Sequence, residues 1–287
     1  MIIDLHVHSS ASDGKLTPPE VLALAAEVGV GVLALTDHDT VAGYAALPAN
    51  AAVVVVSGVE FSTRWSGCGI HLVGLNVDLA SAALANALAH QTAARRARAE
   101  SLARRLAERG IAGALDGATS LARGGAIGRV HFAEYLVRCG TARSVEHAFR
   151  RYLSDRLLRA SDVEWAGMAQ LIDWIRAAGG VAVLAHPAKY RLSRSRLEAL
   201  VSEFRACGGA GLEVISGWQA PATTRDLAAL AKRHELKASI GSDFHQRGQS
   251  WAALGRLPAL PADVEPVWAR WPIANALCTR AQNERIA

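Results

Sequence analysis

Residues 1–14 read MIIDLHVHSSASDG, and this stretch decides how the rest of the chain is interpreted. An apolar run typical of a β-strand carries His6 and His8 two residues apart, and Asp13 follows in the loop just beyond. Because residues two apart on a strand project to the same face, His6 and His8 can bind one metal ion together. The stretch therefore predicts a strand with metal ligands at its carboxyl end.

Apolar runs that carry ligands for divalent metals recur along the chain. The further candidates are His38 in LALTDHDT, Glu60 in VVVVSGVEFS, His71 in GIHLVGLNV, His186 in GGVAVLAHP, and Asp243 and His245 in ASIGSDFH. One HxH pair alone is weak evidence, but so many strand-end sites together indicate a polynuclear metal hydrolase. Catalytic metal ions take about three protein ligands each, so this set predicts two to three ions. Mixed imidazole and carboxylate ligands suit manganese, zinc or iron better than magnesium, and we expect manganese.

Such a site predicts hydrolysis of a phosphate ester. Three divalent ions with three carboxylates leave a surplus charge of about +3, which suits a phosphate dianion. Metal binding lowers the pKa of water towards about 7, and the cations neutralise charge that develops during attack on phosphorus. No covalent intermediate on serine or cysteine is required. The candidate catalytic residues are Asp13, His38, Glu60 and His186.

Strand and helix patterns alternate over the first seventy-odd residues and resume after about residue 165, which predicts an α/β fold with a mainly parallel sheet or barrel. The first helix is expected to begin at Thr17 and Pro18 and to end at Gly29. Barrels of this kind keep their chemistry at the C-terminal ends of strands, where most candidate ligands lie. His71 instead stands near the start of its run. We therefore expect its strand to run the other way or to be irregular.

The stretch from about residue 80 to 165 has long Ala/Arg/Leu helical patterns without β-branched runs. We predict that residues 1–79 and 166–287 form a metal-binding barrel and that 80–165 form a helical insertion, a substrate-binding cap. Its arginine-rich segment QTAARRARAESLARRLAERG presents either an arginine face to a ligand or, the better interpretation for a charge run alone, a solvated face. The proline-containing tail after residue 250 is expected to wrap the surface.

Composition narrows the class of protein. The chain has 287 residues and 51% hydrophobic content, enough for a large core, and the segment at its start is a strand with two histidines. We therefore expect a folded cytoplasmic protein with no signal peptide, no membrane association and no obligate protein partner. The net charge of +5 favours anionic partners. The cysteines lack CxxC spacing and are expected to be buried, reduced thiols: Cys68, Cys139, Cys207 and Cys278.

Several of these motifs occur together in one known family. HxH followed by Asp13, the TDHD block, GVE at Glu60, AHP at His186 and GSDFH resemble the PHP (polymerase and histidinol phosphatase) family of the amidohydrolase superfamily. The resemblance implies a distorted seven-stranded βα barrel with a trinuclear Mn, Zn or Fe site. By motif, it assigns His6, His8, Glu60 and Asp243 to one ion, Asp13, His38 and His245 to a second, and Glu60, His71 and His186 to a third.

The segment IGRVHFAEYLVRCG resembles the GRxHFA segment of one branch, which includes nucleoside 3′,5′-bisphosphate phosphatases and a 5′-to-3′ exoribonuclease type. This implies a metal-dependent phosphatase that removes the 3′-phosphate from nucleoside 3′,5′-bisphosphates, such as adenosine 3′,5′-bisphosphate. The alternative is a 5′-to-3′ exoribonuclease on short 5′-phosphorylated RNA. Histidinol phosphatase and a non-catalytic PHP module are weaker alternatives, because the insertion and the intact ligand set would be unexplained. The expected partner is a nucleotide or short RNA.

Substrate contacts are expected from the insertion and from one strand end. The resemblance assigns Arg129 and His131, and the other candidates are Arg104, Arg105 and Lys189. Where the branch carries a lysine-containing stretch after YL, this chain reads SDRLLRASDVEW, in which Arg156 or Arg159 would replace the lysine.

Four further residues have candidate roles near the ligands. Glu213 ends a strand and is expected to orient a ligand histidine, and Asp37 and Asp39 are expected to hold the tautomer of His38. Trp218 either stacks on a nucleobase or is a core or rim aromatic.

Overall fold

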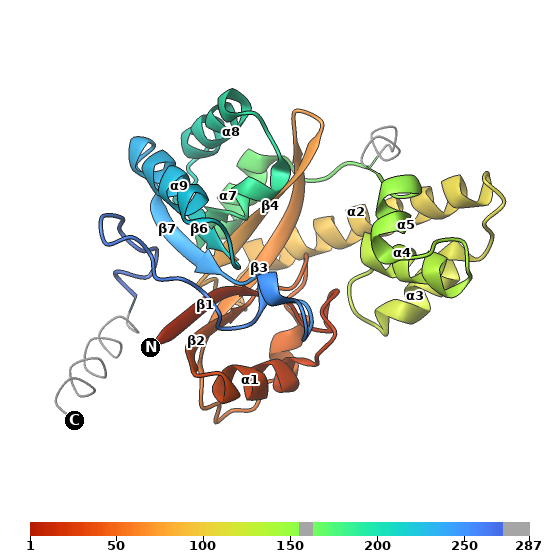
Figure 1. Cartoon of the computed structure of the whole chain (residues 1–287), viewed down its shortest axis with the longest axis horizontal. Helices are drawn as coiled ribbons and strands as arrows, with labels where there is room; N and C mark the ends of the chain where they lie inside the picture. The colour runs from red at the N-terminus through yellow and green to blue at the C-terminus, as the bar shows by residue number, and fades with distance from the viewer. Residues whose placement is uncertain (155–162, 272–287) are drawn as a thin grey trace.

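The computed structural model describes residues 1–154 and 163–271 (Figure 1). The predicted phosphate contact from Arg156 or Arg159 and the predicted thiol of Cys278 lie outside the described residues.

Seven strands form one sheet whose spatial order is the order of the sequence. They are β1 (Ile2–Val7), β2 (Val30–Leu35), β3 (Val54–Trp65), β4 (Cys68–Leu75), β5 (Val181–Leu184), β6 (Gly211–Ser216) and β7 (Lys237–Gly241). A parallel bridge between Val7 and Phe244 brings the end of β7 back to β1. The predicted α/β fold, a distorted seven-stranded barrel, is confirmed.

β4 is the strand that breaks the parallel arrangement. It pairs antiparallel with β3 and with β5, whereas β1–β2, β2–β3, β5–β6 and β6–β7 are parallel. The inference from the position of His71, that its strand runs the other way, is therefore confirmed. Glu60 differs from the sequence interpretation, because β3 does not end there but continues to Trp65 and turns back as β4.

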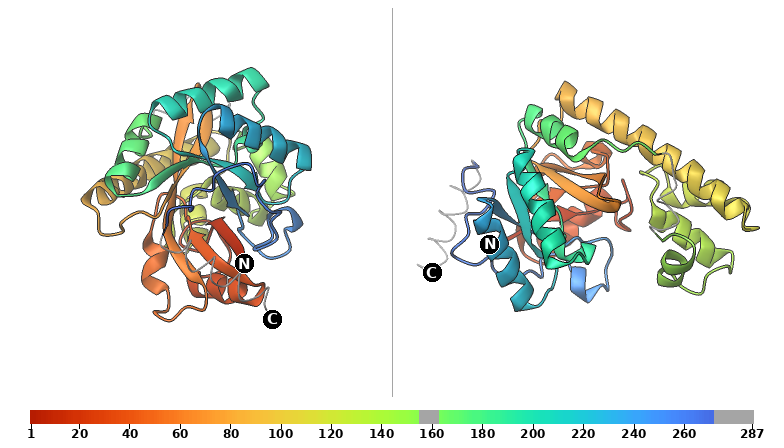
Figure 2. Two further views of the ribbon diagram at one scale, coloured as in Figure 1. Left: turned by 90° about the vertical axis from the view of Figure 1, so that its left-hand side faces the viewer. Right: turned by 90° about the horizontal axis from the view of Figure 1, so that it is seen from above.

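Helices α1 (Pro18–Glu27), α7 (Met168–Ala177), α8 (Arg194–Ala206) and α9 (Pro221–Arg233) pack on the outside of the barrel (Figures 1 and 2). Short 3₁₀ turns follow β2, β5 and β7 at η1 (Ala42–Ala46), η2 (Pro187–Tyr190) and η3 (Ser250–Ala252). The signals for α1 hold: Thr17 caps the helix with Glu20, and Gly29 follows it with a φ of +80°. Only glycine adopts that backbone readily.

A second group of helices projects from one side of the barrel (Figure 1; Figure 2, right). It comprises α2 (Ala82–Ala107), α3 (Ala114–Ala122), α4 (Arg129–Arg138) and α5 (Val145–Arg151). These helices share an apolar core of their own, with Leu102, Leu106, Phe132 and Leu136 among its buried members. The boundaries drawn at residues 80 and 165 and the role of this group as a substrate-binding cap remain predictions.

The sequence predicted that the tail after residue 250 wraps the surface. The described part of this tail also reaches the interior of the barrel. Val267 and Trp271 are buried with Leu5, Val32 and Val183 in the cluster that fills the barrel interior. Backbone bonds tie this segment to β7, since Val267 N–H donates to the Ala238 carbonyl at 2.9 Å. The tail therefore supplies apolar side chains to the interior of the barrel.

The cysteine prediction is partly wrong. The three described cysteines are free thiols, but Cys68 and Cys207 are half-buried and Cys139 is exposed. Within residues 1–154 and 163–271, no helix is long and apolar enough to cross a bilayer.

Candidate metal centre

Backbone pairing between β1 and the loop after β7 sets three candidate ligands in register. The Asp243 N–H donates to the His6 carbonyl at 2.8 Å, and the His8 N–H donates to the Phe244 carbonyl at 2.9 Å. Nε2 of His6 and Nε2 of His8 consequently lie 3.6 and 3.3 Å from Oδ1 of Asp243. Gly241 permits this approach, because a Cβ at that position would stand 2.1 Å from Cβ of His6.

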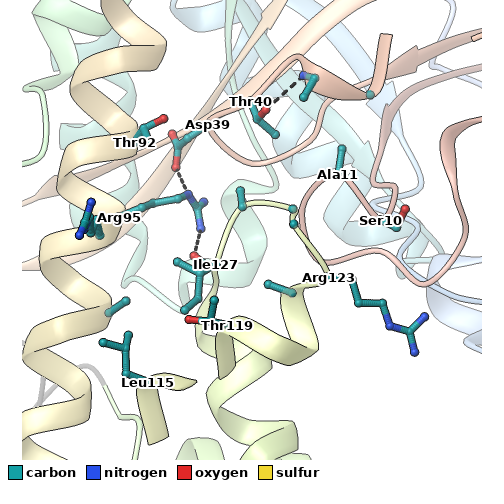
Figure 3. A pocket seen from close by; sticks show the side chains of 18 of the residues that line it. Ser10, Ala11, Asp39, Thr40, Thr92, Arg95, Leu115, Thr119, Arg123 and Ile127 are labelled. Carbon is teal, nitrogen blue, oxygen red and sulfur yellow. Dashed lines mark hydrogen bonds and ion pairs between the residues drawn. The ribbon is translucent and has the colours of Figure 1, made fainter. Parts of the chain in front are cut away.

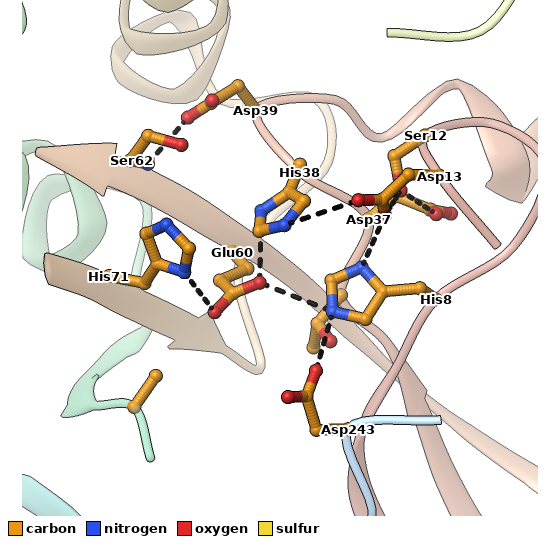
Figure 4. A network of polar contacts seen from close by, with 12 residues as sticks. His8, Ser12, Asp13, Asp37, His38, Asp39, Glu60, Ser62, His71 and Asp243 are labelled. Carbon is orange, nitrogen blue, oxygen red and sulfur yellow. Dashed lines mark hydrogen bonds and ion pairs between the residues drawn. The ribbon is translucent and has the colours of Figure 1, made fainter. Parts of the chain in front are cut away.

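Glu60 lies at the centre of the cluster and presents its two oxygens to different imidazoles (Figure 4). Oε1 lies 2.9 Å from Nδ1 of His71 and 2.8 Å from Nε2 of His186. Oε2 lies 3.3, 3.2 and 3.0 Å from ring nitrogens of His6, His8 and His38. Glu60 would therefore be a ligand shared between cations, since each of its oxygens faces a different set of imidazoles.

Asp13 gathers the remaining ligands at the other end of the cluster. Its carboxylate oxygens lie 3.3 Å from Nε2 of His245 and 3.8 Å from both Nδ1 of His8 and Nε2 of His38. His8 and His245 stack with ring centroids 4.1 Å apart. The structure thus brings all nine sequence-predicted ligands into one continuous cluster.

The donors subdivide into overlapping groups that only partly match the sets implied by the family motifs, since His71 and His186 fall in different groups. Four groups have ligand atoms within 4.8 Å of one another: His8, Asp13, His38 and His245; His6, His8 and Asp243; His6, Glu60 and His186; and His38, Glu60 and His71. His6, His8, His38 and Glu60 are thus each shared between two groups. Nδ1 of His8, Nδ1 of His38 and Oε2 of Glu60 are buried without a hydrogen bond in the described chain. Buried polar atoms left in this way fit cation ligands.

Electrostatics within the cluster favour a bound cation. Burial alone would raise the pKa of Glu60, but the surrounding imidazoles, His38 first among them, hold it well below its ordinary value. Burial would lower the pKa of His8, yet Asp243 and Glu60 raise it to about 10. Burial dominates at His38 and lowers its pKa to about 4. Without metal, His8 therefore carries a proton where a cation would otherwise balance the carboxylates.

Three residues of this region adopt the left-handed backbone region, with φ of 54° at Asp39, 28° at His186 and 55° at Asp243. Each lies a few residues beyond the end of a barrel strand. Such conformations cost energy in residues other than glycine and concentrate at functional sites.

The outer carboxylates only partly follow the sequence interpretation. Glu213 does contact a ligand, because its Oε1 lies 3.1 Å from Nδ1 of His6, and its Oε2 accepts the His186 N–H at 2.5 Å. Asp37 accepts instead from Ser9 and Ser12 and fixes the loop after β1. The role foreseen for Asp37 at the His38 ring is therefore wrong.

Asp39 has a role that the sequence did not reveal, which is to attach α2 to the barrel. Its carboxylate accepts from Nε of Arg95 at 2.6 Å and from the side-chain amide of Gln91 at 2.9 Å. Arg95 also donates to Oγ of Ser62 and to the Ile127 carbonyl, both at 3.1 Å. This buried network joins β2, β3, α2 and the loop before α4.

Arginines from α2 and α4 gather beside the cluster. Burial lowers the pKa of Arg98, the charges of Arg95 and Arg129 lower it further, and Asp39 and Asp13 oppose this. The guanidinium of Arg98 lies 4.9 Å over the ring of Trp165. Like charges that lie side by side are unfavourable unless an anion binds among them. We call the group formed by Arg95, Arg98 and Arg129 the arginine wall.

The other predicted substrate contacts are placed unequally. Arg104 and Arg105 lie in the last turn of α2, at the end farthest from the barrel (Figure 1). His131 is buried, accepts the Gly128 N–H at 3.0 Å, and lies close enough to Asp13 for that charge to affect its pKa, which burial lowers. Nζ of Lys189 lies 2.5 Å from Oδ2 of Asp243, at the cluster itself.

The contribution of α2 has a signature in the sequence. Leu84, Gln91, Arg95, Leu102 and Leu106 recur at helical spacing and form much of its buried face. Polar Gln91 and Arg95 lie within this largely apolar face, which distinguishes Arg95 from exposed Arg96 one position away.

A cavity of about 840 Å³ lies beside the centre, between the barrel loops and helices α2 and α3 (Figure 3). Ser10, Thr40, Thr92, Leu115 and Arg123 are among its lining residues. None of the nine candidate ligands lines it. The pair of Asp39 and Arg95 stands at its boundary.

Comparisons with known proteins agree with this geometry. The model of the PHP domain matches residues 4–123, which include the first six candidate ligands. The 5′-3′ exoribonuclease Rnm of Escherichia coli is 46% identical over 278 residues, with 94% of each chain covered. The chain belongs to the PHP family. The 3′,5′-nucleoside bisphosphate phosphatase of Chromobacterium violaceum is 40% identical over 270 residues, covering 93% of this chain and 95% of that one.

A solved structure extends the likeness to three dimensions. An amidohydrolase from Chromobacterium violaceum with bound sulfate superposes with a TM-score of 0.84 at 39% identity, covering 98% of this chain and 97% of that chain. The family and enzyme class expected from the sequence, a PHP protein that hydrolyses phosphate esters, are confirmed. The relatives carry both activities that the resemblance implied.

Proposed function

We propose that this PHP protein is a metal-dependent phosphatase that removes the 3′-phosphate from nucleoside 3′,5′-bisphosphates and releases the 5′-nucleotide. The nine clustered donors would hold two to three divalent ions, of which manganese suits the mixture of imidazoles and carboxylates best. His6, His8, Glu60 and Asp243 would hold one ion, Asp13, His38 and His245 a second, and Glu60, His71 and His186 a third.

The arginine wall is the observation that carries this proposal. A phosphatase for simple monoesters needs one phosphate site, which the metal centre provides. A second group of cations beside that centre, buried Arg95 with half-buried Arg98 and Arg129, supports a second phosphate on the same substrate. The remaining 5′-phosphate would bind there while the 3′-phosphate lies at the centre.

The chain's own residues would prepare the site for hydrolysis. Divalent ions in such a centre supply Lewis acidity towards water and phosphate oxygens. Glu213 orients the imidazole of His6 through Nδ1 and thereby fixes which nitrogen faces the centre. Nζ of Lys189 would place a positive charge next to the reacting phosphate.

The test compares phosphate release from adenosine 3′,5′-bisphosphate, 3′-AMP and 5′-AMP by the manganese-loaded protein. We expect the bisphosphate to have the highest kcat/KM. Arg98→Met and Arg129→Ala should each raise KM for the bisphosphate about 10-fold or more while changing KM for 3′-AMP little. Arg96→Met, an exposed arginine of the same helix, is the matched control. Equal use of all three esters would refute the proposal.

A second activity, 5′-to-3′ exonucleolytic cleavage of short RNA, uses the same groups. In both reactions water attacks the phosphorus on the 3′-oxygen of a nucleotide whose 5′-phosphate is bound at the wall. The similarity to exoribonucleases at 45% and 46% identity favours it. Its product differs, because a 5′-phosphorylated dinucleotide would yield mononucleotides and no inorganic phosphate.

A further inference from the structure

Two tryptophans on the barrel rim are much more exposed than tryptophans usually are. Trp218 is 65% exposed and Trp251 is 60% exposed. Trp218 follows β6, and Trp251 lies in η3, after β7. Single exposed apolar side chains are ordinary, but large ones that lie side by side form a patch of the kind that marks a binding site.

The backbone holds the two residues together. The Trp218 N–H donates to the Trp251 carbonyl at 2.8 Å. Gly217, which lies between β6 and Trp218, has a φ of +64°, and a Cβ there would stand 2.2 Å from the Trp251 carbonyl oxygen. Only glycine permits both the conformation and the contact. The pair is thus fixed by the fold and does not depend on two independent loops.

The pair also lies close to the metal centre. The Gly217 N–H donates to the Gly241 carbonyl at 2.7 Å, and Gly241 is two residues from the candidate ligand Asp243. Both tryptophans lie beyond the C-terminal ends of β6 and β7, the end of the barrel at which the ligands lie. Lys189, on the neighbouring strand end, contacts Asp243 with its side chain 42% exposed.

The position of the two tryptophans relative to the arginine wall indicates which part of a substrate they can contact. Arg95 of the arginine wall donates hydrogen bonds to Asp39, which follows β2, and to Ser62 of β3. The strands follow one another in sequence order, and the bridge between the end of β7 and β1 closes them into a ring. On this ring, β6 lies three strands from β2 in one direction and three strands from β3 in the other. The tryptophans therefore stand across the metal centre from the wall.

We propose that Trp218 and Trp251 form a stacking site for the nucleobase that follows the scissile phosphate of an oligonucleotide. This inference rests on the proposed function, which places the 5′-phosphate at the wall and the 3′-linked phosphate at the centre. The next nucleotide of an oligonucleotide then extends away from the wall, towards β6 and β7. Indole rings stack on any base, so the site confers length preference without sequence preference.

The proposal distinguishes two substrates of one enzyme. A nucleoside 3′,5′-bisphosphate has no second base and gains nothing from the pair. A 5′-phosphorylated dinucleotide places its second base on the pair. The tryptophans would therefore favour the exonucleolytic substrate over the mononucleotide.

The experiment measures kcat and KM of the full-length, manganese-loaded protein for three substrates. These are adenosine 3′,5′-bisphosphate, 5′-phosphorylated diadenosine, and the same dinucleotide with an abasic second ribose. Trp218→Ala and Trp251→Ala should lower kcat/KM for the diadenosine, mainly through KM, by about 5- to 150-fold, which corresponds to about 1–3 kcal/mol for one stacked base. Phosphate release from the bisphosphate should stay within about twofold, and cleavage of the abasic substrate should not fall further.

Two control variants separate stacking from general effects. Trp218→Phe and Trp251→Phe keep an aromatic face and should restore most of the loss. Leu79→Ala removes an exposed apolar side chain beyond β4, at the other end of the barrel, and should change neither substrate. The mass of each variant in solution is measured in parallel.

Several outcomes would overturn the proposal. Equal loss on the diadenosine and abasic dinucleotide would show that no base is bound at the pair. A tryptophan variant with altered oligomeric state would identify the pair as a contact between copies of the chain. If the wild type hydrolyses the bisphosphate but not the dinucleotide, the proposed function stands and this inference fails. If it hydrolyses neither, both fail.

Discussion

Two buried glutamates at the metal centre differ in what surrounds them. Glu60 faces five imidazoles with its two oxygens, which holds its pKa low and keeps it anionic. Glu213 contacts one ring, that of His6, and one backbone N–H, that of His186. The first is a candidate ligand, whereas the second positions two candidate ligands at once.

At the level of single residues, the sequence was most informative where residue type determines the chemistry. Imidazoles and carboxylates at strand ends have few structural roles, so His6, His8 and His186 could be assigned without coordinates. Arginine has many roles, and its neighbours along the chain do not distinguish them. Arg104 and Arg105, whose role stays a prediction, lie in the last turn of α2, whereas Arg95 and Arg98 have partners on other elements that appear only after folding.

Tyr44 gives a residue-scale prediction of pH dependence. Its hydroxyl accepts the Gly58 N–H at 2.7 Å and lies 2.7 Å from the Leu35 carbonyl. Burial raises its pKa above its ordinary value of 10.0. Above pH 10, the unfolded chain therefore loses a proton that the folded protein keeps, and this contribution to stability declines as pH rises.

Tyr44→Phe should cost about 1–3 kcal/mol of unfolding free energy at pH 7, because the Gly58 N–H loses its partner. The difference between wild type and variant should shrink as pH rises beyond 10, in urea denaturation followed by circular dichroism. Tyr135→Phe, which removes an exposed hydroxyl bonded to the Ala112 carbonyl, is the control and should cost less. A difference that grows above pH 10 would contradict this sign.

Among the elements, α2 makes the connection between barrel and insertion. Its Gln91 and Arg95 meet Asp39 and Ser62 of the barrel, and the same guanidinium reaches the Ile127 carbonyl. The sequence predicted a long helix here but not its direction across the barrel. That direction depends on β4, whose reversal could be inferred only from the position of His71.

Arg95→Met should separate the insertion from the barrel. The substitution leaves the buried carboxylate of Asp39 without its cation, and breaking such pairs costs about 3–5 kcal/mol. We expect a lower Tm and faster proteolysis within residues 80–165, measured by calorimetry and limited trypsin digestion. Arg96→Met is the matched control, since the Arg96 side chain is 84% exposed, and should change stability by less than about 0.5 kcal/mol. Equal effects of the two variants would exclude an anchoring role for Arg95.

For the whole molecule, the metal centre couples stability to cation binding. Its nine donors come from β1, β3 and β4 and from the segments after β1, β2, β5 and β7, so a bound cation links segments that are far apart in sequence. At a free metal concentration of about 100 times Kd, one ion would add about 2.7 kcal/mol to the unfolding free energy.

Removing metal with a chelator should therefore lower Tm by about 5–10 °C, and added Mn²⁺ should restore it, in differential scanning calorimetry. The stabilisation by Mn²⁺ should weaken as pH falls below about 10, because Asp243 and Glu60 outweigh burial and raise the pKa of His8 to about 10, so that its proton competes with the ion. The Glu60→Gln variant should show a much smaller response to Mn²⁺ at every pH. A Tm that chelation leaves unchanged in the wild type would rule out a metal centre that contributes to stability.

The barrel as a whole could be expected from the alternation of strand and helix patterns, but its closure could not. Val267 and Trp271 follow several prolines and carry no strand pattern, yet they pack inside the sheet. Their contribution depends on long-range contacts with Leu5 and Val183, for which periodicity gives no signal.

The antiparallel direction of β4 determines how many residues α2 needs before Gln91 and Arg95. Because β4 runs antiparallel to β3, it ends at the end of the barrel remote from the candidate ligands, and α2 starts there. The helix must then return along the side of the barrel before Arg95 reaches Asp39. Each residue of a helix adds about 1.5 Å of height and about 100° of rotation. Deleting a single residue between Ser81 and Gln91 would therefore turn both anchoring side chains towards solvent. Length changes can be tolerated beyond Leu106, the last residue that this helix places in the core of the insertion, but not before it, so evolution can lengthen only the outer end of this helix.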